Sequence, residues 1–418
     1  MIHSYKYYQY IKYKIIILVF ASIILSQEES YLIILSFDGF RYDYTELNNT
    51  PNLDKIKQHG VKAKSLIPIF PSLTFPNHFS IATGCYAETH NIIGNSFYSK
   101  EFNEFYSYKK TETVSNEKFY DCEPVWVTAE RQGIKTATYF WVGSEANINN
   151  HRPAIYKKYQ NGINAKTKID SAMKWIGYEM ELRPKLIMLY FNEPDYSGHL
   201  HGPHSGNTMN AVLKMDQTLG YLMYKLEEKK IQDKTNIIIL SDHGMTKINY
   251  DKTIVLDNYI SNLNNFIING IGPLVHIDLK ENISYKQIVE LKNKINNIGN
   301  VQAYLKNEIP KDLHYNSINT GEMIIIAEKG WMIGTKANLD NGIFSLKGMH
   351  GYDPKEKEMH GIFYAIGPSF KKKYLIESFE NIHIYPLACH LLDIEPFQYN
   401  SELETGDFSI LKNILINK

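Results

Sequence analysis

The alternation of short apolar runs with helical patterns is the feature of this sequence that most constrains its fold. Residues 31–36 are almost entirely apolar, as expected for a strand that is buried on both faces of a sheet. Further strands are predicted at residues 135–140, 185–191, 236–241 and 323–327, and helices at 51–60, 165–180, 209–230 and 285–295. This alternation predicts an α/β fold, with a mostly parallel central sheet and helices on both of its faces.

The length of 418 residues is compatible with two or three domains, but one large α/β domain with an insertion also accommodates it. The sequence contains no internal repeats, no Pro- or Ser-rich linkers and no blocks of like charge. We therefore predict a single domain over residues 27–418, in which the Asn-rich segment 251–342 is an insertion or cap.

The N-terminus has the pattern of a secretory signal peptide. Lys6, Lys12 and Lys14 precede a run at residues 15–25 that is apolar except for Ser22, and a polar stretch begins at Ser26. A helix over this run spans about 17 Å, roughly half of a bilayer core. We predict that residues 1–26 are a cleaved signal and that the protein is secreted, with an uncleaved signal anchor as the alternative. Secretion would make Asn48 and Asn282 potential glycosylation acceptors.

Charge and cysteine content exclude some classes of protein. Lys plus Arg and Asp plus Glu each count 45, so the formal net charge is zero. Proteins that bind nucleic acid usually carry a basic excess, so nucleic acid is not expected as the main partner. The three cysteines, Cys85, Cys122 and Cys389, are too few for a disulfide framework, and their pairing is left open. Cys389 lies in an apolar helical stretch and is expected to be buried.

Aspartate and histidine recur directly after the predicted strands. In chain order they are Asp38 after the first strand, Asp195 and His199 after the strand at 185–191, Asp242 and His243 after the strand at 236–241, and His350 further downstream. Ligands of open parallel sheets bind at the carboxyl ends of the strands. We therefore expect these side chains to meet at one edge of the sheet.

Carboxylates and imidazoles without thiolates suit zinc or a similar divalent ion. Asp195 and His199 have the i, i+4 spacing that places both side chains on one helical face. Turn chemistry would explain any one of these clusters alone, but their recurrence at one edge favours a metal site. His201 and His204 are assigned to the surrounding loop.

A nucleophile for such a site is available in residues 71–84, which have the pattern of a loop followed by a short helix that ends at Gly84. Thr74 stands near the start of this helix, where free backbone N–H groups and the helix dipole favour an anion. A threonine hydroxyl needs a base or a metal to remove its proton, and the clusters above provide for one. A helix N-cap is the alternative role for Thr74.

These residues lie in motifs that resemble those of the ectonucleotide pyrophosphatase/phosphodiesterase family, within the alkaline phosphatase superfamily. The motifs are SFDGFRYDY (36–44), TFPNHFSIATG (74–84), TAERQGIKTATYFWVGSE (128–145), EPDYSGHLHGP (193–203), SDHGM (241–245) and HGYDP (350–354). The resemblance implies two zinc ions, one held by Asp38, Asp242, His243 and the Thr74 oxygen and the other by Asp195, His199 and His350. It also implies that Thr74 attacks phosphorus and forms a phospho-threonine intermediate, which water then hydrolyses.

The resemblance further implies how substrate is bound. Asn95 falls where the family places an amide donor to the phosphoryl oxygen, and Phe75 and Tyr159 fall where it stacks a nucleotide base. Val142 departs from the family's usual proline, and Cys85 from its usual apolar residue. These departures flank the site, so they bear on substrate preference more than on catalysis.

The leading hypothesis is a secreted dizinc hydrolase that cleaves nucleotide phosphodiester or pyrophosphate bonds and releases nucleoside 5′-monophosphates. A choline-phospholipid phosphodiesterase of the same family and a catalytically inactive binding member are the alternatives. A phosphomonoesterase is disfavoured because no arginine follows the nucleophile to clamp a dianionic phosphate. The expected partner is a small-molecule phosphodiester, and the oligomeric state is left open.

Overall fold

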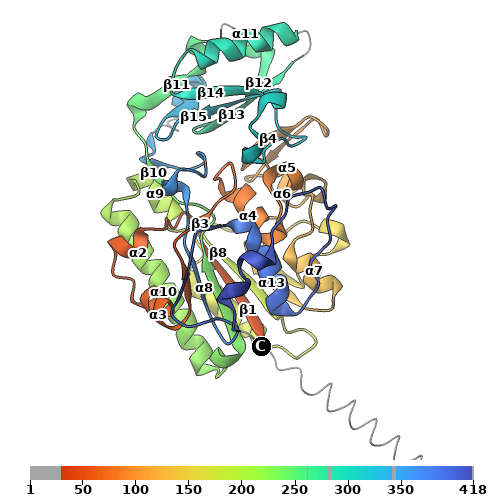
Figure 1. Cartoon of the computed structure of the whole chain (residues 1–418), viewed down its shortest axis with the longest axis vertical. Coiled ribbons are helices and arrows are strands. Elements are labelled where there is room, and N and C mark those ends of the chain that lie inside the picture. The colour runs from red at the N-terminus through yellow and green to blue at the C-terminus, as the bar shows by residue number, and fades with distance from the viewer. Residues whose placement is uncertain (1–29, 261, 281–283, 341–344, 417–418) are drawn as a thin grey trace, which may run out of the picture.

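A computed structural model describes residues 30–260, 262–280, 284–340 and 345–416. It confirms the α/β class, because an eight-stranded sheet runs through the centre of the molecule (Figure 1). Across this sheet the strands are β19 (Tyr374–Ile376), β2 (Val61–Ala63), β18 (Phe363–Ile366), β9 (Thr235–Leu240), β1 (Tyr31–Phe37), β8 (Leu186–Phe191), β6 (Thr136–Tyr139) and β7 (Ile155–Lys157). β18 runs antiparallel to both of its neighbours, and the other neighbouring strands are parallel.

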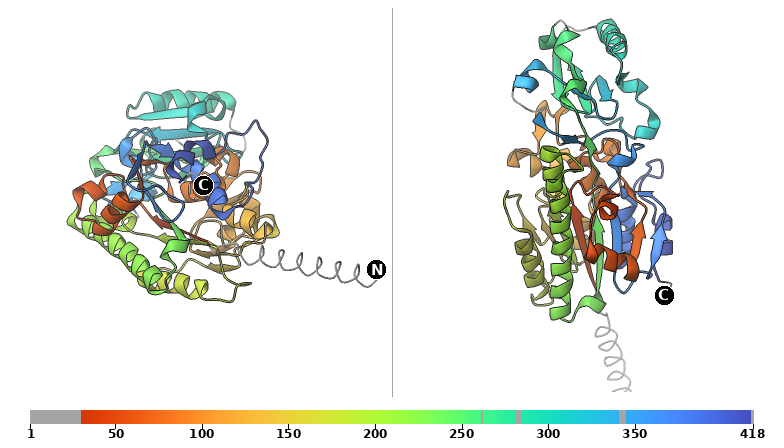
Figure 2. Two further views of the ribbon diagram at one scale, coloured as in Figure 1. Left: turned by 60° about the horizontal axis from the view of Figure 1, so that its bottom comes forward. Right: turned by 90° about the vertical axis from the view of Figure 1, so that its left-hand side faces the viewer.

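Helices cover both faces of the sheet, which explains why its central strands are apolar throughout. Leu32 and Ile34 of β1 point into one core and Ile33 and Leu35 into the other, because successive side chains of a strand face opposite sides. α3 (Pro51–His59), α8 (Ala165–Ile176) and α10 (Gly206–Glu228) cover one face, and α4 (Thr74–Thr83), α7 (Val125–Arg131) and α13 (Ile384–Leu392) cover the other (Figure 2).

The predicted strands and helices are confirmed, with small shifts at their ends. α10 begins at Gly206, three residues earlier than predicted, because the Ser205 side chain caps the helix by accepting a hydrogen bond from the Thr208 N–H. α8 ends at Ile176, where Gly177 follows, rather than at Met180. These ends are set by local capping, which the apolar pattern alone does not report.

A smaller lobe lies beyond the carboxyl ends of the central strands (Figure 1). Its antiparallel sheet is built from β12 (Phe266–Gly270), β13 (Leu274–Leu279), β15 (Met323–Ala327) and β14 (Val301–Leu305), and α11 (Tyr285–Asn296) packs against it. The lobe has its own apolar core, and hydrogen bonds join it to the rest of the chain. In one of these, the buried Tyr315 hydroxyl donates to the Ile93 carbonyl at 2.6 Å.

Several features bear on the predictions for secretion. Cys85 and Cys122 form a disulfide, and Cys389 is free and buried, as expected. The predicted signal peptide and Asn282 lie outside the described residues, while Asn48 is half-buried. In the described part of the chain, no helix combines the length and apolar character needed to span a bilayer.

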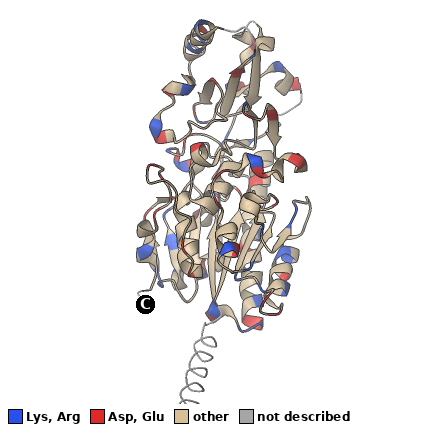
Figure 3. Cartoon of the chain, turned by 90° about the vertical axis from the view of Figure 1, so that its right-hand side faces the viewer, with Lys and Arg blue, Asp and Glu red and all other residues tan. Residues whose placement is uncertain are grey.

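The acidic and basic residues, which are equal in number, are mixed over the outer elements (Figure 3).

Candidate functional site

The two central strands bring the first group of predicted ligands together. β1 and β9 pair in parallel with Ser36 opposite Leu240, so Asp38 and the pair Asp242–His243 emerge side by side at the carboxyl edge. Gly39 lies with Asp38 in the turn that follows β1. It has a φ of +65°, and a Cβ there would lie 2.8 Å from the Asp195 backbone. Glycine is therefore required at this position, both for the turn and for the close approach of the second group.

The first group, Asp38, Asp242 and His243, is almost completely buried. His243 Nε2 lies 3.2 Å from Asp38 Oδ1 and 3.1 Å from Asp242 Oδ2, and the side chains of these residues are at most 2% exposed. Asp242 Oδ2 also lies 3.2 Å from Nδ1 of His78, a buried histidine in the helix α4. Two carboxylates and one imidazole thus converge from adjacent strand ends.

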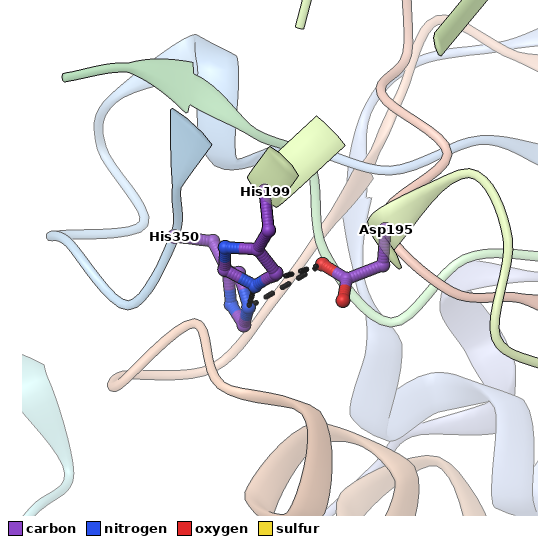
Figure 4. Close-up of side chains that lie close together, drawn as sticks. All are labelled: Asp195, His199 and His350. Atoms are coloured by element: carbon purple, nitrogen blue, oxygen red, sulfur yellow. Dashed lines mark hydrogen bonds and ion pairs between the residues drawn. The ribbon is translucent and has the colours of Figure 1, made fainter. Parts of the chain in front are cut away.

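The second group, Asp195, His199 and His350, is assembled from distant parts of the chain (Figure 4). Asp195 opens α9 (Asp195–His201), and His199 follows one turn later, so the predicted i, i+4 arrangement is present. Asp195 Oδ1 lies 3.4 Å from His199 Nε2 and 3.5 Å from His350 Nε2, and the two imidazole nitrogens are 3.1 Å apart. His350 comes from the segment after β17 (Gly348–Met349).

All three histidines present the same ring nitrogen to their group. His199 Nδ1 bonds to the Gly348 carbonyl at 2.9 Å, His243 Nδ1 to the Gly244 carbonyl at 2.8 Å, and His350 Nδ1 to the Ser72 carbonyl at 2.8 Å. A carbonyl accepts only, so each Nδ1 carries a proton, and Nε2 is the nitrogen turned toward the other members of the group. Histidines that ligate metals are oriented in this way by hydrogen bonds on their second nitrogen.

These two groups fit divalent metal ions. Asp38 Oδ1, Asp195 Oδ1 and Asp242 Oδ2 are buried and accept no hydrogen bond, which is costly for a carboxylate unless a cation is present. Ligands at 2.0–2.2 Å from a tetrahedral zinc ion are separated by about 3.3–3.6 Å. The separations within both groups, 3.1–3.5 Å, lie at or just below that range.

The buried carboxylates favour positive charge in the site: Asp242 and Asp38 raise the pKa of His243 well above its usual range despite its burial. Burial and the neighbouring charge of Asp242 raise the pKa of Asp38, and burial with Asp38 raises the pKa of Asp195 well above its usual range. Burial lowers the pKa of His199 to about 4 and lowers that of His350 well below its usual range, which keeps both imidazoles neutral. The two groups are adjacent, because the rings of His243 and His350 stack at 3.5 Å.

Thr74 lies beside the first group. It is the first residue of α4, and Leu73 occupies the N-cap position, so the alternative role of Thr74 as an N-cap is wrong. Its Oγ1 lies 3.2 Å from His243 Nε2. The hydroxyl therefore stands both at the N-terminus of a ten-residue helix and within reach of the group that would hold a metal.

The Asn95 side chain is held by a hydrogen bond from the backbone of α4. Its Oδ1 accepts a hydrogen bond from the Phe75 N–H at 2.9 Å. Asn95 also lines the cavity, and its Nδ2 amide is the group that can still donate a hydrogen bond. A contact to an anionic oxygen requires such a donor.

A cavity of about 540 Å³ opens onto both groups. Thr74 and Asn95 line it together with Phe75 and Tyr159, and Tyr159 is 55% exposed at its rim. All of the sequence-predicted substrate contacts thus face one space. His201 and His204 belong to neither group, and His204 instead contacts the guanidinium of Arg41 at 3.2 Å.

Three residues near the site were not singled out from the sequence. The Tyr190 hydroxyl donates to Asp38 Oδ2 at 2.5 Å, His78 pairs with Asp242, and the buried Glu145 carboxylate lines the cavity and accepts the Tyr159 N–H at 2.9 Å. His78 and Glu145 lie inside quoted motifs, which could have drawn attention to them. Tyr190 lies in a strand, where an aromatic residue has no distinguishing signal.

The fold and the paired ligand groups define a protein of the alkaline phosphatase type, with a site at the carboxyl edge of its sheet. A sequence model of the type I phosphodiesterase/nucleotide pyrophosphatase family matches residues 32–353, and the chain belongs to this family.

Its relatives include venom phosphodiesterases and ectonucleotide pyrophosphatase/phosphodiesterases. Venom phosphodiesterase 2 of Crotalus adamanteus is 37% identical over 398 residues, which is 93% of this chain and 48% of that protein. Ectonucleotide pyrophosphatase/phosphodiesterase family member 3 of Bos taurus is 35% identical, over 88% of this chain and 43% of that protein. The chain thus spans about half the length of these curated relatives.

A solved structure covers almost the whole fold. Murine ectonucleotide pyrophosphatase/phosphodiesterase 5, in an inactive threonine-to-alanine variant bound to AMP, aligns with a TM-score of 0.85 at 30% identity. The alignment covers 93% of this chain and 100% of that one.

Proposed function

We propose that this protein is a dizinc phosphodiesterase that hydrolyses nucleotide phosphodiester and pyrophosphate bonds and releases nucleoside 5′-monophosphates. The observation that carries the proposal is the placement of the Thr74 hydroxyl 3.2 Å from His243 Nε2, in the lining of a cavity that also contains Asp38 and the whole second group. Asp38, Asp242, His243 and Thr74 would hold one zinc ion, and Asp195, His199 and His350 the other. Paired zinc ions supply Lewis acidity and neutralise charge on phosphoryl oxygens.

The chain's own residues account for binding and nucleophilic attack. Phe75 and Tyr159 hold the base by stacking, and Asn95 Nδ2 donates to a phosphoryl oxygen. Thr74 Oγ1 attacks phosphorus as the bond to the leaving oxygen breaks, and the resulting phospho-threonine is hydrolysed by water. The AMP-bound relative, inactive with one threonine replaced by alanine, supports both a nucleotide ligand and a threonine nucleophile. Venom and ectoenzyme relatives support an extracellular location and, with it, the predicted signal peptide.

The nucleophile is tested with Thr74→Ala. We expect hydrolysis of a nitrophenyl nucleotide ester to fall by about 10³-fold or more, because water must then attack directly. Thr74→Ser, which keeps a hydroxyl, is the matched control and should retain part of the activity with unchanged zinc content. A Thr74→Ala protein that works at the parental rate would sink the proposal.

A choline phosphodiesterase is a second candidate, favoured by one observation. The Glu145 carboxylate, 8% exposed, lies in a cavity walled by aromatic rings, and this combination also suits a quaternary ammonium group. Nucleotide and phosphocholine nitrophenyl esters on one preparation separate the two functions. We expect Tyr159→Ala to raise KM for the nucleotide ester by about 10-fold through lost stacking. If Glu145→Gln instead abolishes a dominant phosphocholine activity, the choline function is correct.

A further inference from the structure

Lys168 is a buried lysine to which the proposed reaction assigns no role. It lies on α8, in contact with Phe140 and Tyr190 of the cavity lining, and is only 4% exposed. No carboxylate of the described residues pairs with its ammonium, and burial alone lowers its pKa to about 8. Lysine is almost never buried without a partner of opposite charge. The free-energy cost of burying this ammonium indicates that Lys168 has a role that compensates for it.

The ammonium is held by a backbone carbonyl and by aromatic rings. Lys168 Nζ donates to the Tyr190 carbonyl at 2.8 Å, at the end of β8. It also lies over the rings of Phe140 and Phe191, at 4.8 Å and 5.0 Å from their centroids. A cation within about 6 Å of a ring face is attracted to it, the more strongly when it is desolvated.

The hydrogen bond from Lys168 to the Tyr190 carbonyl connects Lys168 with Asp38, a predicted metal ligand. Tyr190, whose carbonyl Lys168 holds, donates its hydroxyl to Asp38 Oδ2 at 2.5 Å. The other oxygen, Asp38 Oδ1, is the one that lies 3.2 Å from His243 Nε2. Tyr190 therefore orients the carboxylate, and Lys168 fixes the strand end that carries Tyr190.

The contact of the Lys168 ammonium with the Phe140 ring connects Lys168 with the aromatic residues that line the cavity. Phe140 follows β6 with a φ of +67°, a conformation that a bulky residue adopts only when its surroundings hold it there. Its ring lines the cavity and packs against Tyr159, with centroids 5.2 Å apart. The Lys168 ammonium beneath the ring is one such restraint.

We propose that Lys168 is a positioning residue of the site: its buried ammonium holds the end of β8 and the Phe140 ring, and through them the Asp38 carboxylate and Tyr159. This inference rests on the proposed function, because Asp38 acts on a metal only if the site binds one.

The test measures zinc affinity rather than activity alone. Metal-free Lys168→Met, Tyr190→Phe and the double variant are titrated with zinc against a chromophoric chelator. We expect each single variant to weaken one of the two zinc equivalents by about 10-fold, as for other residues that orient metal ligands. The double variant should bind no more weakly than the weaker single variant, because both act through one chain of contacts. Lys168→Met should also raise KM for the nucleotide ester.

Two controls separate positioning from general loss of stability. Lys168→Arg keeps the charge and donor and should restore zinc affinity to within about 3-fold of the parent, because the guanidinium can still donate to the Tyr190 carbonyl. Lys166→Met removes an exposed lysine from the same helix and should leave zinc binding unchanged. If Lys168→Met does not fold, Lys168→Gln takes its place.

Parental zinc affinity in folded Lys168→Met, in Lys168→Gln or in Tyr190→Phe would overturn the inference and leave the proposed function intact. Effects that multiply in the double variant would also overturn it. A parental protein that binds no zinc would overturn both.

Discussion

The two ligand groups contain similar residues but differ in burial and origin. In the first group, the side chains of Asp38, Asp242 and His243 are at most 2% exposed, and all three extend from adjacent central strands. In the second group, the side chains of Asp195 and His199 are 16% and 21% exposed, and a helix and a distant segment supply the ligands. The comparison suggests a division of roles. If Thr74 is the nucleophile, we expect the first group to hold it in a fixed place and the second, more exposed group to face the departing leaving group.

Removing one carboxylate from each group tests this division most directly. We expect Asp242→Asn to lower kcat/KM by about 10³-fold, because a buried ligand beside the nucleophile is lost. Asp195→Asn should cost about 10²-fold, since its side chain is 16% exposed and water can reach the position it leaves. Metal analysis should show about one zinc equivalent lost in each, and exposed Asp233→Asn should change nothing. If Asp195→Asn is the more damaging variant, the proposed division of roles is wrong.

Asn95→Ala tests whether substrate charge is stabilised on the side of the first group. The change removes one donor in the lining of the cavity, and it leaves both ligand groups intact. We expect kcat/KM to fall by about 10²-fold, as for other single donors to a developing oxyanion. Zinc content should stay at the parental value. A loss of zinc in Asn95→Ala would mean that this residue acts on the metals rather than on the substrate.

Removal of the metals by a chelator should distinguish the two groups by the rate at which each group loses its ion. Because the second group is more open to solvent, we expect its ion to leave a chelator-treated protein about 10-fold faster than the buried one. Zinc remaining on the protein, followed against time, should therefore fall in two phases of one equivalent each. Release of both ions at one rate would show that exposure does not control their exchange.

Much of the fold and site could be predicted from local patterns. The apolar run at residues 31–36 predicts β1 because only a strand covered on both faces tolerates such a run. Since parallel strands end at one edge, the polar residues after β1, β8 and β9 had to meet there. The i, i+4 spacing of Asp195 and His199 likewise required only helix geometry. The helix pattern of residues 71–84 likewise marked Thr74 as a candidate nucleophile. In contrast, the roles of Asn95 and Tyr159 came from resemblance to a family, since no local pattern distinguishes them.

The sequence by itself determined which residues stand at the ends of strands and helices, because backbone periodicity is a local property. Only the tertiary structure decided their environment. It brought His350 against His199 across 151 positions of the chain, paired Cys85 with Cys122, and placed the Tyr190 hydroxyl on Asp38. It also buried Lys168 against residues of the cavity lining. Burial, pKa and the unmet need of three carboxylate oxygens for a cation arise from packing between distant segments, and no local pattern contains them.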